Sequence, residues 1–120
     1  MIINDWDEKE RRNQERYSLK YFLRIVDRDT ESLLGHIIDI SLGGMRLISE
    51  APIPTQKDFR LWMEISLESG LQGKIALKAR SVWGRKDINP ELYDTGFSFI
   101  GLSAEARSTI ENLIRELSSD

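Results

Sequence analysis

Alternation of apolar and polar residues in the middle of the chain constrains its fold more than any other feature. The clearest run places an apolar side chain at every second position: Phe59, Leu61, Met63, Ile65 and Leu67. Successive side chains of a β-strand point to opposite sides, so this run predicts a strand with one buried face. An amphipathic helix would instead need apolar residues three and four positions apart.

The same period of two recurs in five other segments, which are separated by turn-forming residues. The six predicted strands cover the following residues: 18–26, 32–40, 45–49, 59–67, 74–79 and 95–100. A phase shift at Ser81 and Val82 indicates a β-bulge. Ser103 resembles a helix N-cap, and the apolar spacing from Ala106 to Leu117 predicts a terminal helix.

Six short antiparallel strands favour a closed or nearly closed barrel, because closure removes exposed edges. The expected fold is mainly β: a six-stranded antiparallel β-barrel with a C-terminal α-helix that caps or flanks it. Residues 1–17 are densely charged and offer few apolar side chains, so we expect a flexible N-terminal arm. Residues 18–120 form the one domain that a chain of 120 residues accommodates.

Composition argues against several functional classes. The chain has no cysteine and one histidine, His36, so neither a thiolate metal site nor a nucleophilic cysteine can form. We find no phosphate-binding glycine loop and no carboxylate pair that dictates acid–base roles, and we therefore expect no enzyme. A net charge of -3 speaks against DNA binding, and no apolar run is long enough for membrane insertion. A cytoplasmic location is expected.

An arginine cluster in the arm, at Arg11, Arg12 and Arg16, is the first candidate anion site. Two arginines four positions apart arise by chance about once in such a chain, and Arg24 and Arg28 form a second pair. Residues four apart in a strand lie about 13 Å from each other. On an arm or helical turn, however, they approach to about 6 Å. Only the arm pair is therefore suited to clamp one small group.

Asp39-x-Ser41-x-x-Gly44 is the second candidate, and a chance occurrence is expected only about 0.06 times in such a chain. A purely structural interpretation is a tight strand connection, in which Asp and Ser bond the backbone and glycine supplies a positive φ. A glycine-rich turn also lets a ligand approach the backbone closely. Both interpretations remain open for this segment.

Together and in this order, Arg12-x-x-x-Arg16 and Asp39-x-Ser41-x-x-Gly44 resemble the two motifs of the PilZ family, bacterial receptors for cyclic di-GMP. Trp83 after a late strand and the closing segment 96–99 add to the resemblance, which spans roughly residues 11–117. It implies no cofactor beyond the ligand itself. The ligand-binding set implied is Arg11, Arg12, Arg16, Asp39, Ser41, Gly43, Gly44 and Trp83.

The resemblance also implies individual roles. Arg12 and Arg16 would contact guanine and phosphate, since arginine forks onto guanine N7 and O6 and onto phosphate oxygens. Asp39 would accept hydrogen bonds from guanine N1–H and N2–H₂, while Ser41 would bond a base or a phosphate. Arg11 looks like the form that favours an intercalated ligand dimer. Trp83 is interpreted either as packing or as a guanine-stacking surface.

Three rival functions differ in what they require. A PilZ-like protein-interaction module that no longer binds nucleotide would not need the motif residues. A single-stranded nucleic-acid barrel would need a basic groove with interleaved aromatic residues, which the net charge disfavours. An enzyme would need an acid–base constellation. We therefore expect a receptor or adaptor that changes its surface on binding and passes the change to an unidentified downstream protein.

Overall fold

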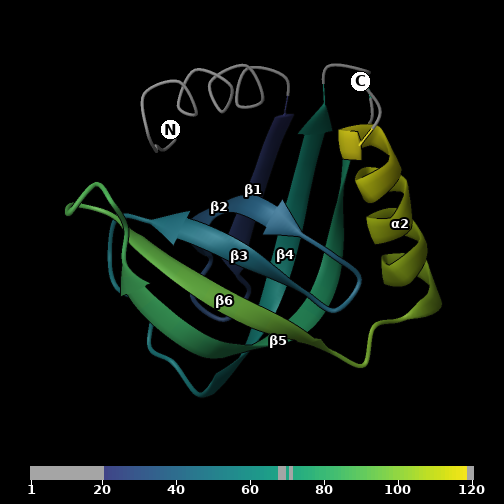
Figure 1. Ribbon diagram of the computed structural model, residues 1–120. Helices are drawn as coiled ribbons and strands as arrows, with labels where there is room; N and C mark the ends of the chain where they lie inside the picture. The colour runs from purple at the N-terminus through teal and green to yellow at the C-terminus, as the bar shows by residue number, and fades with distance from the viewer. Residues whose placement is uncertain (1–20, 68–69, 71, 119–120) are drawn as a thin grey trace.

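A computed structural model of the protein describes residues 21–67, 70 and 72–118. Six strands precede one helix along this part of the chain (Figure 1). The elements are β1 Tyr21–Asp27, β2 Ser32–Ile40, β3 Gly44–Ser49, β4 Lys57–Leu67, β5 Gln72–Lys86, β6 Tyr93–Ile100 and α2 Ala104–Ser118.

The strands close into a barrel in the order β1-β2-β3-β6-β5-β4, with β4 pairing back onto β1. Every neighbouring pair is antiparallel. The predicted six-stranded antiparallel β-barrel with a C-terminal helix is therefore confirmed. The predicted arm, residues 1–17, lies outside the described residues.

The interior of the barrel is filled by alternating side chains of its strands. All five apolar residues of the β4 run are buried, as their period of two predicts. Helix α2 stands at one side of the barrel (Figure 1), and its Ile110 and Leu113 are completely buried in the same core. The helix begins where Ser103 Oγ accepts a hydrogen bond from the Ala106 amide at 3.0 Å, which confirms the predicted N-cap.

Strand β5 is longer than its alternation predicts, because a β-bulge interrupts the pattern without ending the strand. The register with β6 shifts between Ser81 and Trp83, where a bulge was predicted, and pairing then continues to Lys86. Trp83 consequently lies within β5, whereas the sequence placed it after a strand. A bulge adds one unpaired residue, so the side chains that follow it point to the opposite faces of the strand. A prediction based on strict alternation therefore ends the strand too early.

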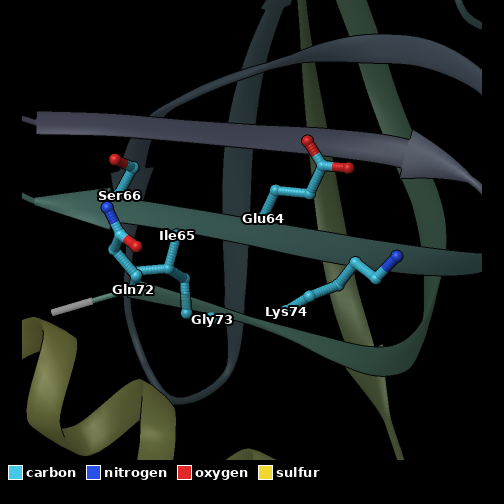
Figure 2. Close-up of a pocket in the computed structure, with 6 residues that line it drawn as sticks. All are labelled: Glu64, Ile65, Ser66, Gln72, Gly73 and Lys74. Carbon is cyan, nitrogen blue, oxygen red and sulfur yellow. The ribbon is translucent and has the colours of Figure 1, made fainter.

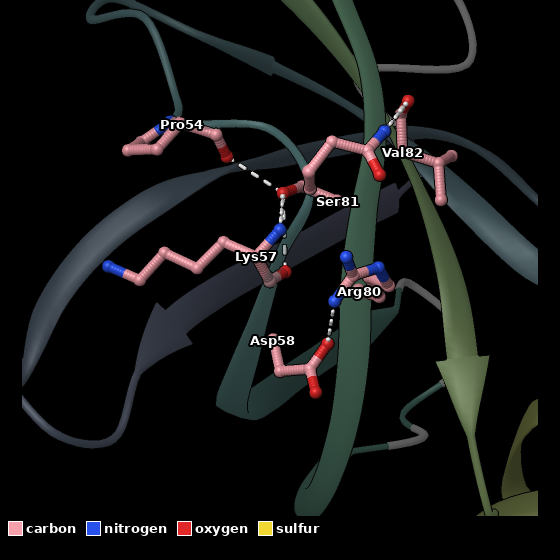
Figure 3. Close-up of polar contacts among 7 residues, drawn as sticks. Pro54, Lys57, Asp58, Arg80, Ser81 and Val82 are labelled. Atoms are coloured by element: carbon pink, nitrogen blue, oxygen red, sulfur yellow. Dashed lines mark hydrogen bonds and ion pairs between the residues drawn. The ribbon is translucent and has the colours of Figure 1, made fainter.

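The bulge is anchored to the segment before β4 (Figure 3). Ser81 is fully buried, and its hydroxyl donates to the Pro54 carbonyl at 2.7 Å. The Lys57 amide donates to Ser81 Oγ at 3.2 Å. Gln56 Nε2 donates to the Val82 carbonyl at 2.9 Å. These bonds hold the backbone of the bulge, and with it the side chains of Val82 and Trp83, in position on the barrel.

Candidate functional site

The segment with the Asp-x-Ser-x-x-Gly motif forms the tight connection from β2 to β3. The Ser41 amide donates to the Gly44 carbonyl at 2.9 Å, which closes the turn. Ser41 Oγ also accepts a hydrogen bond from the Gly43 amide at 3.3 Å. Asp39 and Ser41 are exposed, so their oxygens remain accessible outside the barrel.

The two glycines of this turn serve different purposes. A Cβ on Gly44 would lie 2.1 Å from the Phe97 carbonyl oxygen, so only glycine lets β3 approach β6 this closely. A Cβ on Gly43 would meet nothing closer than Ser41 Oγ at 4.0 Å. Neither glycine has a positive φ, which corrects the structural interpretation of the motif. Gly44 is required by close packing of two strands rather than by a left-handed backbone.

Trp83 extends from β5 across β6. It lies opposite Gly96 in the strand register, and its side chain occupies the space that a residue-96 side chain would fill. The residue is nevertheless 40% exposed. Trp83 therefore packs on the barrel, as one of the two sequence interpretations expects, and also presents part of its side chain to solvent.

A shallow hollow of about 210 Å³ joins these features on the outer surface of the barrel. It spans four strands and is lined by motif residues, by Trp83 and by Arg46, which the sequence analysis missed. The register explains the grouping: Asp39 pairs with Arg46, Arg46 with Gly96, and Gly96 with Trp83. One continuous cross-strand row therefore carries a carboxylate, a guanidinium and an indole.

The profile of the PilZ domain matches residues 10–116, nearly the whole chain. The chain belongs to the PilZ domain family. This match agrees with the six-stranded barrel. PilZ domains are non-catalytic and commonly bind cyclic di-GMP, so the expectation that this domain is not an enzyme is confirmed at the level of the family.

Several solved structures share the fold of this PilZ domain. The Bacillus subtilis inhibitor of motility MotI/DgrA aligns with a TM-score of 0.63 at 16% identity, and K. pneumonia MrkH in its apo state with 0.62 at 17%. These alignments cover 81% and 82% of this chain but only 46% of each of those chains, so this chain spans about half their length. No curated protein matches.

A third structure, the PilZ domain of Escherichia coli YcgR with c-di-GMP, has a TM-score of 0.58 and 22% identity. The alignment covers 82% of this chain and 81% of that one. At such identities the likeness supports the barrel architecture alone. It shows that a single domain of about this extent holds the PilZ fold.

The electrostatics beside the hollow of this PilZ domain centre on Asp94 in β6. Its side chain is only 5% exposed, and Arg85 Nε lies 3.7 Å from its Oδ2. Burial, followed by the neighbouring carboxyl of Asp87, raises the pKa of Asp94 to about 6. The positive charges of Arg46 and Arg85 act in the opposite direction. Sequence spacing gave no signal for this group, since its partners come from other strands and a loop.

A larger hollow of about 370 Å³ lies on another part of the barrel, at β4 and β5 (Figure 2). Glu64 and Lys74 extend from these neighbouring strands, where the register pairs them. None of the predicted site residues lines this hollow. The smaller hollow is therefore the candidate site, because Asp39, Ser41, Gly44 and Trp83 line it.

The remaining predicted site residues, Arg11, Arg12 and Arg16, lie outside the described residues. Within the described part of the chain, no group of three potential metal ligands is present. His36 is partly buried, and its pKa is lowered first by that burial and then by the charge of Arg24. Among the residues that the structure describes, no helix has the length and apolar character needed to cross a membrane.

Proposed function

We propose that this PilZ domain binds cyclic di-GMP at the hollow formed by β2, β3, β5 and β6. The observation that carries the proposal is the convergence of Asp39, Ser41 and Trp83. The three residues come from two chain segments some forty positions apart, and the barrel register gathers them around one surface depression. Membership of a receptor family supports the same conclusion.

The chemistry of the hollow suits guanine. The exposed carboxylate of Asp39 can accept hydrogen bonds from guanine N1–H and N2–H₂. The lack of a side chain at Gly43, which is exposed, lets the ligand approach the backbone of the turn, while Gly44 lines the hollow beside it. Ser41 can add a hydrogen bond to a base or a phosphate, although its hydroxyl also contacts its own turn.

The N-terminal arginines complete the proposed site. Arg12 and Arg16 would address guanine N7 and O6 and a phosphate, because arginine forms forked, charge-assisted hydrogen bonds with both. Arg11 is proposed to favour an intercalated ligand dimer, that is, two nucleotides per chain. Binding would change the exposed surface for a downstream protein in the cytoplasm. If the hydrogen-exchange protection of residues 1–17 is the same with and without ligand, this surface change does not occur.

Isothermal titration calorimetry with cyclic di-GMP tests the proposal directly. Asp39→Ala should weaken binding about tenfold or more, since it leaves the guanine N–H groups without an acceptor. Asp58→Ala is the matched control, because Asp58 is an exposed strand carboxylate that pairs with Arg80 away from the hollow. Arg12→Ala should weaken binding, whereas Arg11→Ala should lower the stoichiometry toward one.

A folded wild-type protein that produces no heat at high ligand concentration would overturn the proposal. A protein-interaction module without nucleotide binding would then be the remaining explanation of the family match. Unchanged binding by both Asp39→Ala and Arg12→Ala would instead place the ligand at another surface. Circular dichroism of every variant, compared with wild type, separates loss of binding from loss of fold.

A further inference from the structure

The exposed side of Trp83 is not a bare aromatic surface. Arg85, two residues further along β5, places its guanidinium carbon 5.2 Å from the centroid of the indole ring. The same indole rests on Gly96. A base that approaches the part of the indole beneath Arg85 therefore meets the guanidinium first, whereas the remainder of Trp83 stays exposed.

Asp94 forms an ion pair with Arg85. The two residues are paired in the β5–β6 register, and Arg85 Nε lies 3.7 Å from Asp94 Oδ2. Asp94 is buried, whereas the Arg85 side chain is 62% exposed. A buried carboxylate can restrain the inner edge of the guanidinium while the outer face remains open to solvent. The cation–π contact with Trp83 restrains the plane of the same group.

We infer that Arg85 is a further ligand-binding residue, whose guanidinium forms the surface on which a guanine base of the ligand stacks, and that Asp94 is its positioning residue. The inference rests on the proposed function and deepens it. Guanidinium is planar and weakly hydrated, and it stacks on nucleic-acid bases much as aromatic side chains do. Trp83 then supports the guanidinium through the cation–π contact.

The position of the hollow indicates where the two bases of a ligand would lie. Trp83 lines the hollow together with Asp39, and Gly96 and Arg46 connect them in the strand register. Arg85 pairs with Asp94 in the next register row, so a base on Arg85 would lie beside the Trp83 end of the hollow, away from Asp39. A ligand with two guanines separated by a phosphodiester ring could place one base at Asp39 and the other at Arg85.

Calorimetric titration of cyclic di-GMP into Arg85→Ala, Arg85→Lys and Arg80→Ala tests the inference. Arg85→Ala should weaken binding by about fivefold to a hundredfold, the range for loss of one stacked base. Arg85→Lys should not restore it, because an ammonium keeps the charge but has no plane. Arg80→Ala is the matched control: Arg80 is a partly exposed arginine of the same strand that pairs with Asp58, whereas Arg85 lies over Trp83.

Each outcome has a distinct meaning. If the wild type binds and Arg85→Ala binds equally well or more tightly, the inference is wrong but the proposed function stands. Arg85 would then only shield Trp83 from the ligand. Full rescue by Arg85→Lys would also overturn it, since charge without stacking would suffice. Absence of binding by the wild type would overturn the proposed function as well. Asp94→Asn should weaken binding less than Arg85→Ala does, because it loosens Arg85 without removing it.

Discussion

Trp83 and Gly96 are in contact so close that a Cβ on Gly96 would lie 2.2 Å from the indole Nε1. The strand register places the two residues opposite each other, just beyond the bulge in β5. The position of the indole at the hollow therefore depends on the absence of a side chain in the neighbouring strand. Gly96 acts on the site without offering any group that binds a ligand.

Gly96→Ala should displace Trp83 from β6, because the new methyl group and the indole cannot share this space. We expect a changed tryptophan fluorescence spectrum, a loss of about 1–3 kcal/mol in the free energy of unfolding, and weaker ligand binding. Gly73→Ala is the control, since a Cβ at Gly73 has nothing within 4 Å. If the fluorescence spectrum and the stability of Gly96→Ala equal those of the wild type, Trp83 does not contact Gly96 as described.

The paired glycines of the β2–β3 turn give a second test. Gly44→Ala should destabilise the fold by about 2 kcal/mol or more, because its Cβ would force the Phe97 carbonyl away and break the contact between β3 and β6. Gly43→Ala should fold as stably as wild type within about 0.5 kcal/mol, since its Cβ points into free space. Urea unfolding of both variants provides the comparison, and equal losses would contradict it.

Local patterns were sufficient to predict the barrel. The burial of alternate residues such as Leu61 and Met63 follows from the period of two, and the Ser103 cap follows from residue type and position. The bulge at Ser81 was also visible, because a strand that changes faces changes phase. These features depend on neighbours in the chain, which the sequence displays directly.

Features that depend on cross-strand register were not predictable in the same way. Arg46 and Asp94 carry no motif, and they matter only because the barrel order places β3 and β5 on either side of β6. The requirement for glycine at Gly44 was interpreted as backbone conformation, but it arises from the neighbouring strand. The roles of Arg12 and Arg16 remain predictions, since both residues lie outside the described part of the chain.

Ser81 provides a third prediction, because its hydroxyl anchors the bulge that positions Trp83. Ser81→Ala should lower the free energy of unfolding by about 1–3 kcal/mol, since the Pro54 carbonyl and the Lys57 amide lose their bonds to the buried Ser81 hydroxyl. Ser98→Ala, at an exposed serine of β6, should change it by less than about 0.5 kcal/mol. Thermal or urea unfolding measures both, and equal stability of the two variants would disprove the anchoring role.

Asp94 makes the stability of the fold depend on pH in an unusual direction. Its pKa is raised from 3.8 to about 6 in the folded state, first by burial and then by Asp87. The folded protein therefore holds this proton more tightly than the unfolded chain does. The resulting stabilisation is fully present below about pH 4 and is lost as the pH rises through about 6. Its upper limit is about 3 kcal/mol, because one pKa unit corresponds to about 1.4 kcal/mol.

Asp94→Asn should remove this dependence, because an amide does not ionise. Relative to wild type, the variant should gain free energy of unfolding between about pH 4 and pH 8, with the change centred between the unfolded and folded pKa values. Urea unfolding across this range measures the difference. Asp29→Asn is a control of opposite sign, since the hydrogen bond from Arg60 lowers the pKa of Asp29 and that carboxylate therefore stabilises the fold at higher pH. A difference between wild type and Asp94→Asn that stays constant with pH would show that Asp94 ionises as an ordinary exposed carboxyl.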